Sequence, residues 1–256
     1  MNFTELHQQK SPLIIANVWD AGSAIAAQQA GFKALGTSSA AIAAMLGYED
    51  GEAIPFDEMF YVITRIKSVC HVPLSVDLEA GFGSSVDEVA TNLSRLVRLG
   101  ISGINLEDSR VVNGIRQLRD AAAFADMIKA LRQATISESP LFFNIRTDTY
   151  LLGHEQALQE TRLRGQRYAE AGADGFFVPC LTQEKEIETL ARECTLPLNV
   201  MCMPGLPSFD RLEALGVKRI SMGNVVHSAM QEKLKDVLCT IRAQRAFTGV
   251  FTDERS

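Results

Sequence analysis

The sequence predicts an α/β fold with one domain over residues 1–256, a single (β/α)8 TIM barrel. Eight apolar runs of four to six residues alternate with longer segments of helical pattern, which is typical of strands buried on both faces. No linker or low-complexity stretch divides the chain. Because right-handed crossovers close eight parallel strands into a barrel, we expect this fold; an open doubly wound sheet is the alternative.

The predicted strands follow two alternating start signals. The first, third, fifth and seventh open with Pro-Leu, and proline stops a helix while it starts an extended segment. The other four follow a glycine, which ends a helix in the left-handed conformation. The predicted strands are residues 13–17, 34–37, 74–79, 103–107, 141–146, 175–178, 198–202 and 219–222, and the glycines are Gly31, Gly100, Gly172 and Gly216. Between the third and fourth strands, Ser85 to Glu88 predicts a capping box that opens a helix.

Composition narrows the class of protein. The formal net charge is −6, and no block of five or six basic residues occurs, which argues against nucleic acid or a membrane surface as the main partner. No apolar run approaches the roughly 18 residues of a membrane span, and the first residues lack the apolar stretch of a signal peptide. The five cysteines show no CxxC spacing, so we expect reduced thiols in a cytoplasmic protein.

Carboxylates gather where the third and fourth predicted strands end. Asp77 and Glu79 are two residues apart on the third strand, so they are expected to share a face, and Glu107 and Asp108 end the fourth. In a barrel these strand ends meet at the mouth, where chemistry takes place. Crowded carboxylates repel one another unless a cation neutralises them, and oxygen ligands favour Mg²⁺ or Mn²⁺. The alternative is a cluster of acids at helix N-termini.

The neighbouring strand ends carry groups suited to an anion. Asn144 and Arg146 share a face of the fifth strand, and a guanidinium binds a carboxylate or phosphonate through two hydrogen bonds. The alternative for Arg146 is a structural ion pair with one of the acids. Small residues after the second strand, around Thr37 and Ser38, allow backbone N–H groups to approach an anion, although they also simply permit a tight turn.

These segments resemble the isocitrate lyase/phosphoenolpyruvate mutase superfamily over about residues 12–227. The resemblance rests on Asp77-Leu78-Glu79-Ala80-Gly81-Phe82-Gly83, Asn105-Leu106-Glu107-Asp108 and Asn144-Ile145-Arg146-Thr147-Asp148. Residues 37–50, which close with Asp50, look like the loop that follows the second strand in this family. The chain looks closest to a mutase-like, uncharacterised branch with an Asn-x-Trp-Asp opening, here Asn17-Val18-Trp19-Asp20.

The resemblance implies a metal site and an assembly. It implies Mg²⁺ bound directly by Asp77, with Glu79, Glu107 and Asp50 holding its waters. It also implies a homo-oligomer, a dimer or tetramer, in which the last helix, Val225–Gln244, exchanges between neighbouring subunits.

The resemblance further implies how a substrate binds. Backbone amides at Thr37 and Ser38 would hold the carboxylate of a pyruvyl or oxaloacetate-like group. Arg146 matches the family's substrate-binding arginine, and we assign catalytic roles to Arg146 and Asp50. Trp19 and Asn144 complete the expected substrate-binding set.

Departures from the family pattern restrict the reaction. The family's carbon–carbon lyases carry Lys-x-Cys-Gly-His after the fourth strand, whereas residues 109–119 contain no Cys, Lys or His, which counts against isocitrate or methylisocitrate cleavage. Pro179 stands where the mutase has a histidine, which weakens the prediction of phosphoryl transfer. Glu79 replaces the usual aspartate, and Ser38 replaces a glycine.

We therefore predict a Mg²⁺-dependent lyase that acts on a small 2-oxo or 2-hydroxy dicarboxylate of the oxaloacetate or malate type through a metal-bound pyruvate enolate. The first alternative is a C–P bond mutase or hydrolase acting on a phosphonopyruvate-like substrate, in which Arg110, Arg116 and Arg119 would serve the phosphonate. The second alternative, of another class, is a catalytically inactive homologue that binds metal and oxalate. The absence of the acid/base loop motivates it.

Overall fold

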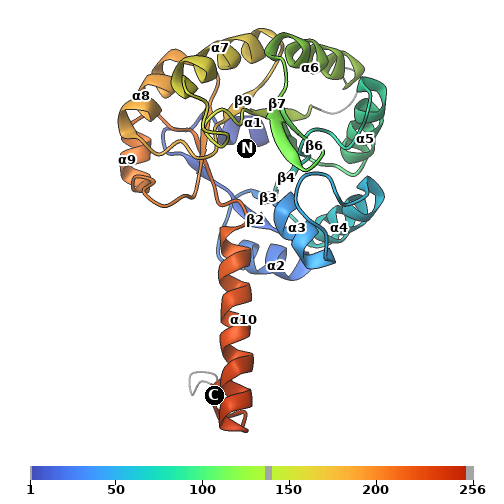
Figure 1. The fold of residues 1–256 in the computed structure, drawn as a ribbon, viewed down its shortest axis with the longest axis vertical. Helices are drawn as coiled ribbons and strands as arrows, with labels where there is room; N and C mark the ends of the chain where they lie inside the picture. The colour runs from blue at the N-terminus through green and yellow to red at the C-terminus, as the bar shows by residue number, and fades with distance from the viewer. Residues whose placement is uncertain (1, 136–139, 252–256) are drawn as a thin grey trace.

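The computed structural model describes residues 2–135 and 140–251 and forms a barrel of parallel strands inside a ring of helices (Figure 1). Residues 1, 136–139 and 252–256, which the predicted domain includes, lie outside the described residues. The α/β barrel fold predicted from the sequence is confirmed.

The sheet has the order β1-β11-β10-β9-β8-β5-β4-β3-β2 with parallel pairing throughout. The first predicted strand is divided at Ile15, so that its first half pairs with β11 and its second half pairs with β3. This division brings the two edges of the barrel together. The strands are β1 (Leu13–Ile14), β2 (Ala16–Val18), β3 (Leu35–Thr37), β4 (Leu74–Asp77), β5 (Gly103–Glu107), β8 (Phe142–Arg146), β9 (Gly175–Phe177), β10 (Leu198–Met201) and β11 (Arg219–Ser221).

The predicted strand starts are accurate because they depend on local backbone preferences. Gly31 and Gly100 follow helices and have φ values of 85° and 80°, the left-handed conformation that glycine adopts without strain. The strand ends are less accurate. The third predicted strand was expected to reach Glu79, whereas β4 ends at Asp77.

The helices form the outer ring. They are α1 (Phe3–Leu6), α2 (Ala21–Gln29), α3 (Ser39–Leu46), α4 (Phe56–Val69), α5 (Val86–Arg98), α6 (Ala121–Thr135), α7 (Ala157–Glu170), α8 (Glu184–Glu193), α9 (Phe209–Ala214) and α10 (Val225–Gln244), followed by the 3₁₀ turn η1 (Thr248–Val250).

Helix α5 begins where predicted, but its N-terminal cap differs from the expected capping box. The Ser85 hydroxyl accepts a hydrogen bond from the Glu88 N–H group at 3.2 Å, as the motif requires. The Glu88 carboxylate instead accepts from the N–H and hydroxyl groups of Ser84, each at 2.7 Å. The preceding residue therefore takes the place of the reciprocal partner.

Two hydrophobic clusters stabilise the barrel. The larger one lies between the sheet and the helices, where residues such as Ile63, Leu93 and Phe176 are fully buried. The smaller one includes Phe3 from α1 and Phe142 from β8. Their rings pack edge to face with centroids 5.5 Å apart, so the short N-terminal helix is packed against a barrel strand.

The segment after β5 forms an antiparallel hairpin of β6 (Ser109–Val112) and β7 (Ile115–Leu118). The strands predicted from the sequence do not include this segment. The turn residues Asn113 and Gly114 have φ values of 53° and 76°, which a two-residue hairpin turn of this kind requires. Asn-Gly between β-favouring residues is a hairpin signal and would have identified this element.

Helix α10 projects away from the barrel (Figure 1). Of its twenty residues, His227 is the one that is buried. No helix in the described ranges is both long and apolar enough to cross a membrane.

Candidate active site

The C-terminal ends of the strands surround a cavity of about 210 Å³. It brings together side chains from β4, β5, β8 and β7 and from the loops that follow β3 and β4. Six of the residues predicted from the sequence line it: Ser38, Asp50, Asp77, Glu79, Glu107 and Arg146.

Asp77 occupies the last position of β4 and is held by the segment that follows β3. Its Oδ2 atom accepts hydrogen bonds from the Ser39 hydroxyl at 2.7 Å and the Ser39 N–H group at 3.2 Å. Its own N–H group donates to the Thr37 hydroxyl at 2.9 Å. The buried Oδ1 atom has no hydrogen-bond partner among the described residues. The carboxylate is therefore fixed on one side and unpartnered on the other.

Glu79 reaches the same cavity by a different route from the one predicted. It lies beyond the end of β4 with a φ of 48°, so strand alternation does not orient it. The side chain is buried, and both carboxylate oxygens lack a partner among the described residues. Burial, together with the negative charges of Asp77 and Asp50, raises the pKa of Glu79 to about 9.

Glu107 lies between two arginines. Its carboxylate contacts Nη1 of Arg146 at 3.1 Å and accepts a hydrogen bond from Arg116 of the hairpin. Burial raises its pKa to about 7, while the two arginine charges oppose that shift. Arg116 also lies 3.6 Å from the carboxylate of Asp50, which joins the loop after α3 to the hairpin. Desolvation and the charge of Asp77 raise the pKa of Asp50.

The donor set fits a hard divalent cation. Three buried carboxylate oxygens, one on Asp77 and two on Glu79, have no partner among the described residues. Four carboxylates and two guanidiniums line the cavity, so the net charge of the lining is −2 when all six groups are ionised. Across residues 2–135 and 140–251, no three His, Cys, Asp or Glu side chains form a ready-made metal centre. The arrangement suits Mg²⁺, which keeps several waters and takes one or two direct carboxylates.

Arg146 is oriented by a buried carboxylate on the same segment. Its Nε–H group donates to Asp148 at 2.6 Å, and the Ser109 hydroxyl donates to the other oxygen of Asp148 at 2.5 Å. Asp148 is fully buried. The ion pair that the sequence analysis considered for Arg146 is present, and the guanidinium still lines the cavity.

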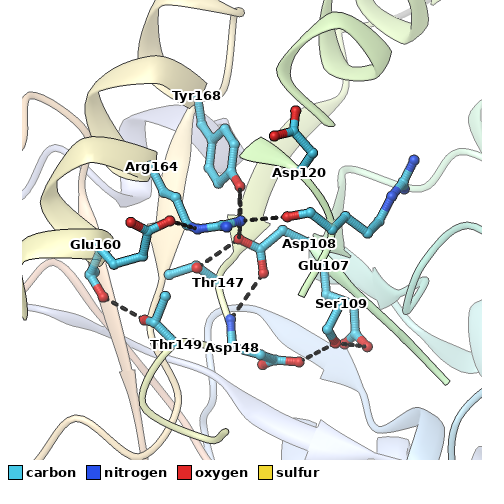
Figure 2. Close-up of polar contacts among 12 residues, drawn as sticks. Glu107, Asp108, Ser109, Asp120, Thr147, Asp148, Thr149, Glu160, Arg164 and Tyr168 are labelled. Atoms are coloured by element: carbon cyan, nitrogen blue, oxygen red, sulfur yellow. Dashed lines mark hydrogen bonds and ion pairs between the residues drawn. The ribbon is translucent and has the colours of Figure 1, made fainter. Parts of the chain in front are cut away.

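Asp108 does not line the cavity and instead contacts Asp148 and the side chains behind it (Figure 2). One of its oxygens accepts from the Asp148 N–H group at 3.1 Å. The other accepts from the Thr147 hydroxyl at 2.7 Å, the Tyr168 hydroxyl at 2.7 Å and Arg164 at 2.9 Å. Asp108 is thus a buried, hydrogen-bonded carboxylate that does not line the cavity.

Three other predicted substrate-binding residues lie outside the cavity lining, and the backbone amide of Ser38 is not free to bind a substrate. Thr37 is buried and acts on Asp77 through its hydroxyl. The Ser38 N–H group donates to the Val18 carbonyl at 3.0 Å, so this amide is already used. Asn144 lies below the cavity, where its side-chain amide donates to two other asparagines. Trp19 packs edge to face on His227 with ring centroids 5.0 Å apart. Trp19 and Asn144 are therefore not brought to the cavity.

Asn17 and Ser39 also line the cavity and are not among the site residues predicted from the sequence. Asn17 joins the two closing strands: its Oδ1 atom accepts from the N–H groups of Met222 at 2.8 Å and Gly223 at 3.2 Å. Its place in the Asn-x-Trp-Asp opening was the available signal. Ser39, which holds Asp77, carried no distinctive signal.

The three arginines considered for a phosphonate separate in the structure. Arg116 lines the cavity, whereas Arg110 donates to the Gly83 carbonyl at 2.9 Å. Arg119 places its guanidinium over the Phe124 ring, 5.0 Å from the centroid. One hairpin arginine therefore reaches the site.

A parallel barrel with acidic and basic side chains at its C-terminal mouth is typical of enzyme active sites. Residues 3–242 match the family model described as phosphoenolpyruvate phosphomutase, and the chain belongs to this family. It is an enzyme of the isocitrate lyase/phosphoenolpyruvate mutase superfamily, as the sequence predicted.

Relatives in sequence span most of the chain. An uncharacterised protein of Mycobacterium tuberculosis strain H37Rv is 36% identical over 90% of this chain and 84% of its own. The 2-methylisocitrate lyase of Escherichia coli K12 is 31% identical over 74% of this chain and 65% of its own. Oxaloacetate decarboxylase 1 of Pseudomonas fluorescens Pf0-1 is 28% identical over 95% of this chain and 84% of its own.

Solved structures share the fold. A Burkholderia cenocepacia J2315 protein with a provisional phosphonomutase assignment is 38% identical, with a TM-score of 0.86 over 92% of this chain and 97% of its own. A phosphonopyruvate hydrolase in complex with oxalate and Mg²⁺ is 22% identical, with a TM-score of 0.87 over 100% of this chain and 92% of its own.

Proposed function

We propose that this protein is a Mg²⁺- or Mn²⁺-dependent lyase that acts on a 2-oxo or 2-hydroxy dicarboxylate of the oxaloacetate or malate type. The observation that carries the proposal is the set of three unpartnered, buried carboxylate oxygens in a cavity that Arg146 also lines. An acidic pole suits a cation and a guanidinium suits the carboxylate of a substrate. The similarity to an oxaloacetate decarboxylase supports this substrate class.

The metal would be held by residues at the ends of β4 and β5 and in the loop that follows α3. Asp77 would ligate it directly through Oδ1, and Glu79, Glu107 and Asp50 would hold its waters. When bound, the cation supplies Lewis acidity to substrate oxygens. The hydrogen bonds from Ser39 fix the other oxygen of Asp77, which keeps this carboxylate in one orientation.

Arg146 would bind and orient the substrate carboxylate. A guanidinium offers five N–H donors, and the contacts to Asp148 and Glu107 engage its Nε and Nη1 atoms. These two contacts hold the group against the cavity wall, so it is preorganised for an anion. Decarboxylation requires no side chain to remove a proton, which agrees with a segment 109–119 that contains no Cys, Lys or His. Solvent would supply the proton that completes the product.

A second candidate is cleavage or rearrangement of a C–P bond. The observation that favours it is the position of Arg116, which lines the cavity together with Arg146. Two guanidiniums suit the three oxygens of a phosphonate better than a single one does. The similarity to a phosphonopyruvate hydrolase is at the level of the fold.

The test compares substrates under one set of conditions. The purified protein with MgCl₂ or MnCl₂ receives oxaloacetate, malate or phosphonopyruvate. Pyruvate is measured for oxaloacetate, glyoxylate for malate, whose C2–C3 cleavage needs no oxidant, and pyruvate with inorganic phosphate for the phosphonate. We expect metal-dependent turnover of a dicarboxylate that EDTA abolishes and Asp77→Ala lacks. Turnover of the phosphonate alone would overturn the proposal in favour of the second candidate. No turnover together with tight oxalate binding would identify a non-catalytic binding protein.

A further inference from the structure

An arginine side chain lies inside the barrel, beneath the cavity. Arg219 belongs to β11 and is among the largest fully buried side chains, with 1% of its surface exposed. Its Nη2 atom donates to Oδ1 of Asn105 at 3.2 Å. Asn105 belongs to β5, which lies across the barrel from β11 in the strand order. The guanidinium therefore crosses the barrel interior.

This guanidinium is part of a polar layer that forms the floor of the cavity. The Asn144 amide donates to Oδ1 of Asn105 and to Oδ1 of Asn199, each at 2.9 Å. The Asn199 amide donates to the Ser221 hydroxyl at 3.1 Å. Asn105 and Ser221 line the cavity, whereas Arg219 does not. One hydrogen bond thus separates the charged group from a residue that the substrate can reach.

Among the described residues, no carboxylate pairs with the charge of Arg219. Within the described part of the chain, no ion pair involves Arg219, and its Nε and Nη1 atoms have no hydrogen-bond partner. Burial lowers its pKa to about 9, opposed by the charge of Asp77, so the group is protonated at neutral pH. A buried, unpaired charge destabilises the folded state, and replacement by an apolar residue would avoid that cost.

We propose that Arg219 is a positioning residue that holds the cavity floor through Asn105. Its positive charge beneath the site also raises the affinity of the cavity for an anionic substrate. The inference rests on the proposed function, since it concerns the anion that this site would bind. Arg219 would thus act on the site from below, in addition to Arg116 and Arg146, which line the cavity.

The charge has opposite effects on the two ligands that the site would hold. It repels a cation bound by Asp77 and Glu79, and it attracts a dianion bound above the floor. Removal of the charge is therefore expected to leave Mg²⁺ affinity unchanged or higher and to lower oxalate affinity. Damage to the site would instead weaken the binding of both ligands.

The experiment measures both affinities by isothermal titration calorimetry on the full chain, first with MgCl₂ and then with oxalate at saturating MgCl₂. Arg219→Met keeps an unbranched side chain without the charge, and Arg219→Lys keeps the charge. Lys218→Met is the matched control: it removes the same charge from the neighbouring position, where Nζ donates to the Gln9 carbonyl at 3.0 Å. Thermal melting checks that each variant folds.

We expect Arg219→Met to weaken oxalate binding by about tenfold or more, with no loss of Mg²⁺ affinity and no fall in melting temperature. Arg219→Lys and Lys218→Met should bind oxalate within about threefold of the wild type. Wild-type oxalate affinity in Arg219→Met would overturn the inference, and so would equal losses for both ligands. A wild-type protein that binds no Mg²⁺ would instead refute the proposed function.

A second variant keeps the inference falsifiable if Arg219→Met does not fold. Arg219→Gln keeps an N–H donor on the side chain and removes the charge, so it alters the charge beneath the cavity without adding one to the residues that line it. We expect weaker oxalate binding and unchanged or tighter Mg²⁺ binding. Unchanged oxalate affinity in this variant would overturn the inference.

Discussion

The Nε–H group of Arg146 donates to the fully buried carboxylate of Asp148 at 2.6 Å, across a separation of two residues on one segment. Asp108 accepts a hydrogen bond from the Asp148 N–H group, so the Asp148 carboxylate has little freedom to move. The orientation of Arg146 therefore depends on a chain of buried acids as well as on Glu107.

Asp148→Asn should misplace Arg146 while the fold remains. The amide cannot form the charged hydrogen bond that holds Nε, so the guanidinium loses its fixed direction. Misplacement of a substrate-orienting group by about 1 Å can cost on the order of 10²-fold in rate, and we expect a loss of this size in kcat/KM for the dicarboxylate. Steady-state kinetics and oxalate titration measure the effect.

Asp174→Asn is a suitable control for that experiment. Asp174 forms an ion pair with Arg132 away from the cavity, so its loss also removes an arginine–aspartate contact. It should change the melting temperature only and leave oxalate affinity unaltered. If Asp148→Asn binds oxalate as the wild type does, Arg146 does not depend on Asp148.

Asp77→Ala should abolish metal binding. The direct ligand is removed, and Glu79 and Glu107 are then left close together with no firmly held cation between them. We expect the rise in melting temperature on addition of Mg²⁺ or Mn²⁺ to vanish, and activity to fall by orders of magnitude. Calorimetric titration and melting curves with and without metal provide the measurement.

The control for Asp77→Ala is Asp87→Ala, which removes an exposed carboxylate from the first turn of α5. It should retain the metal-dependent rise in melting temperature. Unchanged metal affinity in Asp77→Ala would mean that the carboxylates form a structural cluster, and the proposed function would lose its main support.

The buried His7 predicts a loss of stability in mild acid. Its ring stacks on Phe142 with centroids 4.1 Å apart, and burial, together with the charge of Arg219, lowers its pKa to about 3 from 6.5. The folded state therefore keeps His7 neutral at pH values where the unfolded chain takes up a proton. Stability contributed by the neutral ring is present above pH 6.5 and decreases as the pH falls toward 3.

His7→Phe retains a stacked ring without a titrating group, so it should remove this part of the pH dependence. Denaturant unfolding at pH 7 and pH 5 should show that the wild type loses about 2 kcal/mol more than the variant. His71→Phe changes an exposed histidine and should behave as the wild type does. If the free energy of unfolding falls by the same amount between pH 7 and pH 5 in the wild type and in His7→Phe, His7 is not held neutral.

The exposed face of α10 predicts self-association. Met230, Leu234 and Leu238 are spaced by four residues and are 55%, 51% and 57% exposed, so they form one apolar stripe on the projecting helix. We predict a dimer or tetramer in which this helix packs on a neighbouring subunit. The double variant Leu234→Lys/Leu238→Lys should lower the molar mass in light scattering to that of a monomer.

Leu163→Lys provides the comparison, since Leu163 is 54% exposed on α7 and the substitution adds the same kind of charge. It should leave the molar mass unchanged. A monomeric wild-type protein, or an unchanged mass in the double variant, would contradict the prediction.

Sequence alone determined the features that depend on local backbone preference. Glycines that follow helices and prolines that open strands identified the barrel strands, because left-handed and extended conformations are strongly residue-specific. The positions of the strands in the sequence also placed Asp77, Glu107 and Arg146 at the same end of the barrel, because the carboxyl ends of parallel strands meet there.

Tertiary structure decided which of those polar groups face the cavity. Glu79 enters through a left-handed turn, and Arg116 enters through the hairpin that follows β5. Asn144 and Arg219 instead form the layer below, because register between strands far apart in sequence determines which side chains meet inside the barrel. Pairings of this kind depend on packing in three dimensions, and a linear pattern of residues does not record them.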